Sequence, residues 1–183
     1  MLPVLETERL ILRSLRLDDL DDFYVYTRNI NVAHPAGFEP PQSIEDSRKT
    51  LEKFMNGDEV WAIEWKETSR VIGTVGLHAD SKSGTASSKA LGYALSEEYW
   101  NRGIVTEAAR RMIRHAFEAF PIDVLRIYHF QGNNGSRRVI EKCGFVYEGT
   151  LRHIDKRADG TFEDDVCYSI LREEFEAGQC CAV

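Results

Sequence analysis

The tripeptide Asn101-Arg102-Gly103 stands between a segment patterned like a strand and a segment patterned like a long helix. Gly103 can adopt backbone angles that a side chain would forbid, so it suits a tight turn. A helix that begins just after such a turn presents unpaired backbone N–H groups and a partial positive charge. These groups can hold a phosphate or pyrophosphate, although a strand–turn–helix without any ligand has the same local pattern.

The elements on either side of this turn follow from hydrophobic periodicity. Leu91, Tyr93 and Leu95 alternate with small residues, which is typical of a strand. A helix is expected over residues 105–120, because apolar side chains recur there on one helical face and Pro121 ends the pattern. That apolar face consists of Ala108, Ala109, Met112, Ile113, Ala116, Phe117 and Phe120.

A second group of polar residues lies further along the chain. Asn133-Asn134-Gly135-Ser136 is expected to be a turn, and residues 137–142 are expected to form a short helix that ends at Gly144. Without any ligand, the same residues would form a capped helix with an exposed Ser136. The segment also belongs to a longer motif, which follows the glycine turn along the chain. This second motif is Asn133-x-x-Ser136-x-Arg138-Val139-x-Glu141-Lys142-x-Gly144-Phe145.

Both motifs resemble those of the GNAT N-acetyltransferases. EYWNRGIVTEA, residues 98–108, is similar to the coenzyme-A loop of the RimJ/RimL branch, whose enzymes acetylate the N-termini of ribosomal proteins. The superfamily writes this loop as Q/R-x-x-G-x-G/A. Here Trp100 and Val105 replace its outer positions, and Gly103 keeps its type. The opening LETERLILRSLRLDDLDDF also resembles this branch, so the resemblance covers about residues 5–172.

The resemblance implies an α+β GNAT fold. In this fold a mixed, mostly antiparallel, twisted sheet of about seven strands is flanked by about four helices. Periodicity places strands at 8–15, 60–65, 71–78, 91–95, 124–130, 145–151 and 165–171. It places helices at about 18–27, 44–55, 105–120 and 137–142, with a loop at 31–42. We expect a single domain over residues 1–183, with a core at about 5–172 and a C-terminal tail at 173–183.

The implied activity is transfer of an acetyl group from acetyl-coenzyme A to a primary amine, in enzyme class EC 2.3.1. The acceptor is a protein N-terminal amine or a small-molecule amine. The implied cofactor-binding residues are Leu95, Asn101, Arg102, Gly103, Ile104, Val105, Thr106, Asn133, Ser136 and Arg137. The implied catalytic groups are the Leu95 backbone N–H, which stabilises the oxyanion, and Ser136. Many relatives place a tyrosine acid at the position of Ile140, and in this branch a serine at the Ser136 position takes that role.

The amine must lose a proton before it attacks. An N-terminal amine has a reference pKa of about 7.7–8.0, whereas that of lysine is about 10.4, so the former needs less help from a base. Chain position makes four carboxylates candidates, although each is more typical of a surface or structural charge: Glu64, Glu97, Glu163 and Asp165. For Asp165 we expect a structural pairing with Arg152. His129 falls in a strand beside the predicted site. The five histidines have no metal-ligand spacing, so no metal is expected.

Composition restricts the possible partners. The formal net charge of -7 argues against general nucleic-acid binding, which needs a basic surface. No apolar run approaches the roughly 20 residues of a membrane span, and no signal-peptide pattern precedes the first strand, so a cytoplasmic protein is expected. Cys180-Cys181-Ala182-Val183 formally fits a prenylation motif, but no polybasic segment precedes it.

Two other functions stay open at this point. An acyl-coenzyme-A-binding sensor or interaction module without turnover is compatible with the missing tyrosine at Ile140. A nucleoside-triphosphate enzyme is disfavoured, because no Gly-Lys-Ser/Thr follows the glycine turn. The sequence leaves the oligomeric state open, as a monomer or a homodimer.

Overall fold

The computed structural model describes residues 2–57, 59–83, 85–156 and 160–178. This part of the chain divides into two compact units. Unit 1 consists of the described residues up to His78 together with Gly92–Met112. Unit 2 consists of Ala79–Leu91 and the described residues from Ile113 onward. Strand β5 (Ser88–Leu95) and helix α4 (Ile104–Ala119) each contribute residues to both units.

The strands of unit 1 follow one another in the order β1-β2-β3-β4-β5. They are β1 (Leu5–Glu6), β2 (Leu10–Ser14), β3 (Val60–Trp65) and β4 (Arg70–Ala79), joined by the second half of β5. The pairs β1–β2, β2–β3 and β3–β4 are antiparallel, and the register between β3 and β4 shifts at Ile63/Glu64. The predicted hairpin at residues 66–70 is therefore confirmed.

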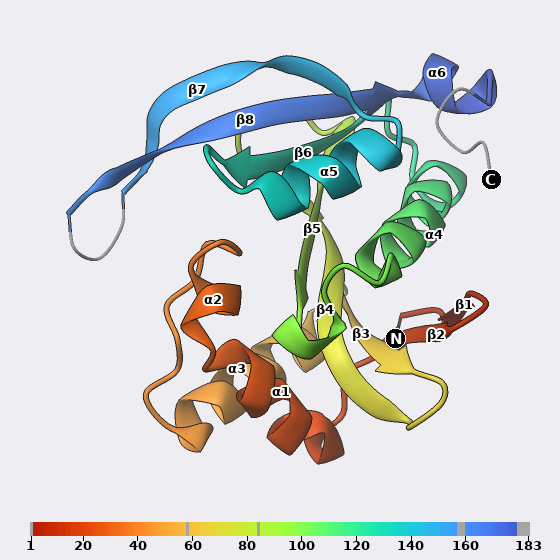
Figure 1. Ribbon diagram of the computed structural model, residues 1–183. Coiled ribbons are helices and arrows are strands. Elements are labelled where there is room, and N and C mark those ends of the chain that lie inside the picture. Colours follow the sequence, from red (N-terminus) through yellow and green to blue (C-terminus); the bar gives the residue numbers. More distant parts are fainter. Residues whose placement is uncertain (1, 58, 84, 157–159, 179–183) are drawn as a thin grey trace. The chain divides into compact units, whose positions relative to one another are not determined.

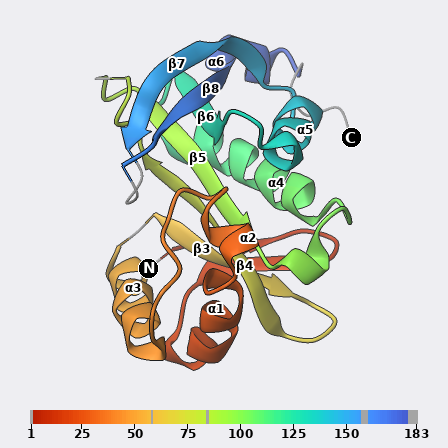
Figure 2. The same ribbon diagram turned by 60° about the vertical axis from the view of Figure 1, so that its left-hand side comes forward.

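The helices of unit 1 are η1 (Leu17–Asp19), α1 (Leu20–Thr27), α2 (Ile30–Ala33), α3 (Ile44–Asn56) and η2 (Glu97–Tyr99). Figure 2 shows α1, α2 and α3 on one side of the unit-1 strands. Apolar side chains from these helices and strands form a core, because burying each large one contributes roughly 1.5–3 kcal/mol. The core consists of Leu15, Leu20, Phe23, Tyr26, Val32, Leu51, Val60, Ala62, Val71 and Ala94.

Helix caps explain one expectation that is confirmed and one that is wrong. Ser43 Oγ accepts the Asp46 N–H at 3.2 Å, so α3 begins where its cap predicted. Residues 31–42 were expected to be a loop throughout, but α2 occupies the first part of that segment. Its cap is Asn29, whose Oδ1 accepts the Asn31 N–H at 3.0 Å.

The strands of unit 2 are arranged in the order β5-β6-β8-β7. They are β6 (Val124–Phe130), β7 (Val146–Lys156) and β8 (Phe162–Leu171), and they are accompanied by α5 (Asn134–Lys142) and α6 (Arg172–Glu176). β5 and β6 are parallel from Ser88↔Val124 to Leu91↔Ile127, whereas β6–β8 and β7–β8 are antiparallel. Figure 1 shows β7 and β8 as long neighbouring strands beside β6.

Arg172, at the start of α6, caps the end of α4 within unit 2. Its guanidinium donates to the carbonyl oxygens of Phe117 at 3.3 Å, Phe120 at 3.0 Å and Ile122 at 2.8 Å. A cation at this end of a helix satisfies carbonyl groups that have no intrahelical partner, and it opposes their partial negative charge. Phe175 stacks on Phe117 at 4.7 Å between ring centroids, which holds α6 in place.

The predicted fold class is confirmed as a mixed, mostly antiparallel sheet with helices. Within the described residues it has eight strands and six α-helices, and the additional elements are short: β1, α2 and α6. β7 and β8 are longer than the expected 145–151 and 165–171. No helix among the described residues is both long and apolar enough to cross a membrane. The single domain remains a prediction, and Cys180–Val183 lies outside the described residues.

Candidate functional site

The turn before α4 has left-handed backbone at two positions, of which the sequence predicted only Gly103. Gly103 has φ = 72°, and Asn101 has φ = 58°, which asparagine tolerates better than most residues. The Glu107 N–H donates to the Gly103 carbonyl at 3.0 Å, the bond that opens α4. The amides of Ile104, Val105 and Thr106 precede this bond, so they belong to the end of the helix that favours anions. α4 thus begins one residue before the expected start.

Two side chains around this turn are held by aromatic and backbone groups of unit 1. The Arg102 guanidinium lies 5.2 Å from the ring centroids of both Trp65 and Tyr99. Trp100 Nε1 donates to the Leu95 carbonyl at 2.9 Å, which ties the turn to the end of β5. The Arg102 side chain thus rests on aromatic rings. The backbone N–H groups of the turn are therefore the groups best suited to donate hydrogen bonds to an anion.

Glu107, in the first turn of α4, links that helix to the segment between β1 and β2. It accepts hydrogen bonds from Thr7 Oγ1 at 2.6 Å, the Arg9 N–H at 2.9 Å and Arg9 Nε at 2.6 Å. Arg9 Nη1 also donates to the Arg102 carbonyl at 3.0 Å. Burial alone would raise the pKa of Glu107, but the hydrogen bonds from Thr7 and Arg9 outweigh it and hold this pKa below its ordinary value.

Replacing Glu107 by glutamine is expected to make stability less dependent on pH. Because the pKa of Glu107 is lowered in the folded state, its carboxylate stabilises the fold above its unfolded pKa of about 4.3. That contribution is lost as the pH falls through the folded pKa. The difference in melting temperature between native protein and Glu107→Gln should therefore be largest near pH 7 and shrink below about pH 4. Glu8→Gln, at an exposed neighbouring position, is the control. A difference that stays constant across this range would contradict the role of the carboxylate.

Leu95, the predicted oxyanion donor, is buried at the end of β5 in unit 1. The next residue fixes the strand end, because the Ser96 N–H donates to the Ile72 carbonyl at 2.8 Å. Across from Leu95 lies Gly73, where a Cβ would come within 2.3 Å of the Ala94 carbonyl oxygen. The two strands therefore approach each other closely beside the predicted donor.

The second motif forms the start of α5 in unit 2. Asn133 Oδ1 accepts the Ser136 N–H at 3.0 Å and caps the helix, so α5 begins at Asn134 rather than at the expected residue 137. Ser136 is half-buried, whereas Arg137 is exposed and pairs with Glu141 through Nε and Oε1 at 3.0 Å. Ile140, at the position of the missing tyrosine, is fully buried.

The predicted residues thus fall into two sets. Leu95 and residues 101–106 lie together in unit 1, and Asn133, Ser136 and Arg137 lie together in unit 2. Each set is brought together by local structure that the sequence indicated, a glycine turn in one case and a capped helix in the other.

Two of the candidate bases have structural partners in unit 1. Glu64 Oε2 lies 2.5 Å from Arg13 Nε, in an ion pair with little exposure. Glu97 accepts hydrogen bonds from Asn29 Nδ2 at 2.6 Å and Asn31 Nδ2 at 3.2 Å, and these bonds lower its pKa. A carboxylate with a lowered pKa is a weaker base. Glu97 therefore fits an anchor for the start of α2 better than a proton acceptor.

In unit 2, Asp165 is 2% exposed and forms an ion pair with Lys82, whereas Arg152 was the partner expected from the sequence. Lys82 Nζ also lies 4.6 Å from the Tyr128 ring centroid. The fourth candidate, Glu163, lies half-buried in β8. Within the described residues there is no cluster of three or more histidine, cysteine or acidic residues suited to a metal ion.

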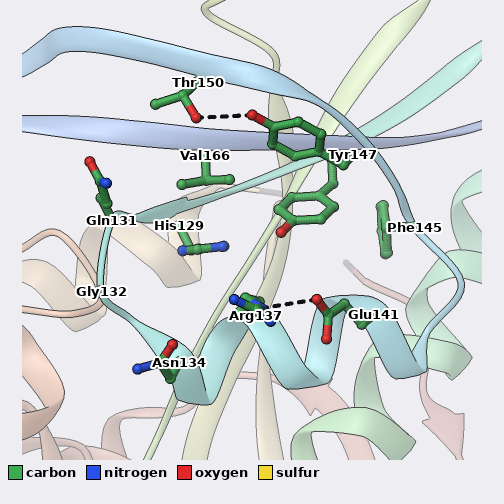
Figure 3. A pocket seen from close by; sticks show the side chains of 11 residues that line it. His129, Gln131, Gly132, Asn134, Arg137, Glu141, Phe145, Tyr147, Thr150 and Val166 are labelled. Atoms are coloured by element: carbon green, nitrogen blue, oxygen red, sulfur yellow. Dashed lines mark hydrogen bonds and ion pairs between the residues drawn. The ribbon is translucent and has the colours of Figure 1, made fainter.

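Unit 2 also contains a cavity of about 510 Å³ (Figure 3). It is bounded by the end of β6, the turn that follows, α5, β7 and β8. His129, which is 6% exposed, lies in its wall, and Arg137 is part of its lining. The sequence placed His129 in a strand beside the predicted site. The aromatic rings around it come from distant segments of the chain, so no local sequence pattern indicated the cavity.

Comparison with known proteins places the chain in a family. The family model described as an acetyltransferase (GNAT) domain matches residues 9–146. The uncharacterized N-acetyltransferase YoaA of Bacillus subtilis is 30% identical over 177 residues, which are 94% of this chain and 98% of that protein. A crystal structure of a GNAT-family acetyltransferase from Bacillus anthracis superposes with a TM-score of 0.84 at 23% identity, covering 94% of this chain and 100% of the other.

A second similar structure contains bound acetyl-CoA. It is the microcin C7 self-immunity acetyltransferase MccE in complex with acetyl-CoA and AMP, with a TM-score of 0.74 and 23% identity. The alignment covers 90% of this chain and 93% of that one. At this level of identity the similarity establishes a shared fold.

Proposed function

Because this chain belongs to the GNAT acetyltransferase family and is an N-acetyltransferase of its RimJ/RimL-like branch, we propose that it acetylates a primary amine by direct attack on acetyl-coenzyme A. The observation that carries the proposal is the opening of α4. There the left-handed Gly103 and the amides of residues 104–106 form an end that suits a diphosphate. The exposure of Asn101, Arg102 and Gly103 leaves that end open to a ligand.

Acetyl-coenzyme A supplies the thioester, and the residues of this chain supply binding and charge stabilisation. The amine nitrogen forms a bond to the thioester carbon, and the Leu95 N–H donates to the oxyanion that develops. The nitrogen then releases its extra proton to solvent, the oxyanion re-forms the carbonyl and the carbon–sulfur bond breaks. Ser136 donates a hydrogen bond to the departing thiolate, which takes up a proton from solvent to become the thiol. Asn133 contributes an amide that donates and accepts, which suits the pantetheine arm. These are the roles that the resemblance of the two motifs to the family implies.

An N-terminal α-amine is the acceptor class that this chemistry favours. At pH 7.5 a far larger fraction of such an amine is neutral than of a lysine side chain, because their reference pKa values are about 7.7–8.0 and 10.4. Glu64, Glu97 and Asp165 are all engaged in structural contacts. An acceptor that loses its proton easily therefore matches this chain better than one that needs a strong base.

A thiol-release assay with acetyl-coenzyme A and a panel of amines tests the function. The panel contains a peptide with a free N-terminus, the same peptide blocked there but carrying a free lysine, a polyamine and an aminoglycoside. We expect thiol release with at least one amine, fastest with the free N-terminus. Faster release with the blocked peptide would contradict the proposed acceptor class.

A non-catalytic acyl-coenzyme-A-binding module is the second candidate function, and one observation favours it. Ile140, buried at the position where many relatives carry a tyrosine acid, has no proton to give. Tight binding of acetyl-coenzyme A together with no thiol release from any amine would support the module and overturn the enzymatic proposal.

Gly103→Val is expected to weaken acetyl-coenzyme A binding. There is space for a side chain, because a Cβ would lie 3.7 Å from Arg9 Nη2, but a β-branched residue is strained at φ = 72°. The strain, roughly 1–2 kcal/mol, should shift the turn and disturb its amides. Calorimetric titration measures the dissociation constant, with Gly103→Asn as the control that tolerates this φ. Equal affinity of native protein and the valine variant would count against the loop as a binding site.

Ser136→Ala is expected to lower kcat while leaving the affinity for acetyl-coenzyme A nearly intact. A hydrogen bond to a charged group contributes about 1.5–3 kcal/mol, which corresponds to a roughly 10- to 100-fold slower turnover. The capping bond from the Ser136 N–H to Asn133 survives the substitution, so α5 should persist. Ser136→Thr retains the hydroxyl and should retain most activity. Unchanged kcat in the alanine variant would remove Ser136 from the mechanism.

A further inference from the structure

The cavity of unit 2 has the size and lining of a small-molecule site. Its volume of about 510 Å³ lies within the range of roughly 300–1,000 Å³ that is usual for ligand pockets. Such sites combine apolar or aromatic walls with a few polar groups that fix the ligand's orientation. Here Phe145, Tyr147 and Tyr168 contribute aromatic surface, and Gln131 and Asn134 contribute amides.

His129 provides a buried hydrogen-bond acceptor in the wall of this cavity. Its Nδ1 lies 2.9 Å from the Phe130 carbonyl oxygen. Since a carbonyl only accepts, Nδ1 carries the hydrogen and Nε2 of the neutral ring is an acceptor. Nε2 is shielded from solvent and has no hydrogen-bond partner among the residues that the structure describes. A buried polar atom without a partner is unfavourable, so a donor that reached it would be stabilised.

The rings around His129 form a connected aromatic wall. Tyr168 stacks on His129 with 5.7 Å between ring centroids and 29° between ring planes. Tyr147 meets Tyr168 edge-on at 5.5 Å and 69°. Aromatic rings favour offset-stacked and edge-to-face partners at these separations, so a further flat ring fits such a wall.

Arg137 lies below the His129 ring in Figure 3, on the side of α5. Both side chains of its ion pair with Glu141 are exposed, and such surface pairs contribute little to stability. The Arg137 side chain can therefore change position at low cost when a ligand enters the cavity.

We propose that this cavity binds a flat aromatic or heteroaromatic small molecule that carries an N–H or O–H donor. The ring lies against Tyr147, Phe145 and Tyr168, and the donor bonds to His129 Nε2. The acetyl-transfer chemistry uses neither His129 nor these three rings, and the cavity lining shares only Arg137 with the expected coenzyme-binding residues.

Titration of the native protein with indole and with benzofuran tests the proposal. The two molecules have the same size and shape, but benzofuran has a ring oxygen in place of the N–H. Ligand-detected NMR gives both dissociation constants. We expect indole to bind about tenfold more tightly than benzofuran, because only indole donates to Nε2. Equal affinities, or no binding of either molecule at millimolar concentration, would overturn the proposal.

Two variants locate the site. His129→Phe keeps a ring but removes the acceptor, so indole and benzofuran should then bind equally. Thr150→Trp places a large side chain on an exposed part of the cavity lining and should weaken indole binding by more than tenfold. This second variant tests the site even if His129→Phe does not fold. The matched control is Leu151→Trp at the next residue of β7, whose side chain is exposed on the opposite face of the strand. Indole affinity unchanged by Thr150→Trp would place the ligand elsewhere and refute the site.

Discussion

Replacing Asp19 by alanine is expected to lower the free energy of unfolding by about 3–5 kcal/mol, because it leaves a buried charge without its partner. That charge is Arg13, which is 6% exposed. Its Nη1 and Nη2 each lie 2.8 Å from an Asp19 carboxylate oxygen, and its Nε bonds to Glu64. The hydrogen bonds to Asp19 raise the pKa of Arg13 more than burial lowers it, so the guanidinium stays charged at every accessible pH.

Asp19 has a second role that adds to this effect. Its Oδ2 accepts the Arg16 N–H at 2.7 Å and thereby holds the turn that leads into α1. Urea unfolding of native protein and Asp19→Ala measures the loss, and Asp18→Ala, at an exposed neighbour in η1, is the control. A destabilisation no larger than that of the control would mean that Glu64 alone compensates Arg13.

Gly73→Ala is expected to destabilise the fold by about 1–3 kcal/mol and to lower turnover as well. The added Cβ would lie 2.3 Å from the Ala94 carbonyl oxygen and 3.0 Å from Leu95 Cα, and both are backbone atoms that cannot rotate away. The strands must separate, and the shift falls on the residue whose N–H we propose as oxyanion donor. Turnover should therefore fall by more than the loss of folded protein explains.

Gly92→Ala is the matched control for this prediction. It lies on the neighbouring strand β5, and its Cβ would meet His78 Cδ2 at 3.5 Å, an ordinary contact. Thermal unfolding and steady-state kinetics of both variants separate stability from activity. If Gly73→Ala retained the native melting temperature and kcat, the close approach of β4 and β5 would have no bearing on Leu95.

Elements with a strong local signal were predictable from the sequence. Apolar alternation placed β6, the Ser43 cap placed the start of α3, and the glycine turn with its apolar face placed α4 within one residue. Helix starts were predicted wrongly where a capping side chain, rather than apolar periodicity, determined them. The Asn29 cap started the four-residue helix α2 inside a presumed loop, and the Asn133 cap started α5 earlier than expected.

Contacts between distant residues could not be predicted from local pattern. Glu107 accepts hydrogen bonds from Thr7 and Arg9, about a hundred residues away in the sequence, and Asp165 forms an ion pair with Lys82. The exposed ends of β7 and β8 lack the alternation of a half-buried strand, and a register shift at Leu151/Asp155 interrupts their pairing. The candidate site was recognised through its motifs, whereas the contacts that support it emerged only from the fold.

The arginine–tryptophan contacts beside the α4 turn give this chain an intrinsic optical reporter. The guanidinium groups of Arg9 and Arg102 lie 5.7 and 5.2 Å, respectively, from the Trp65 ring centroid. Trp100 donates a hydrogen bond to the Leu95 carbonyl. Trp61 is fully buried in the core and supplies a constant background. Indole emission responds to nearby charge, so a change in the position of Arg102 alters the fluorescence spectrum, and the state of the turn can be followed without a label.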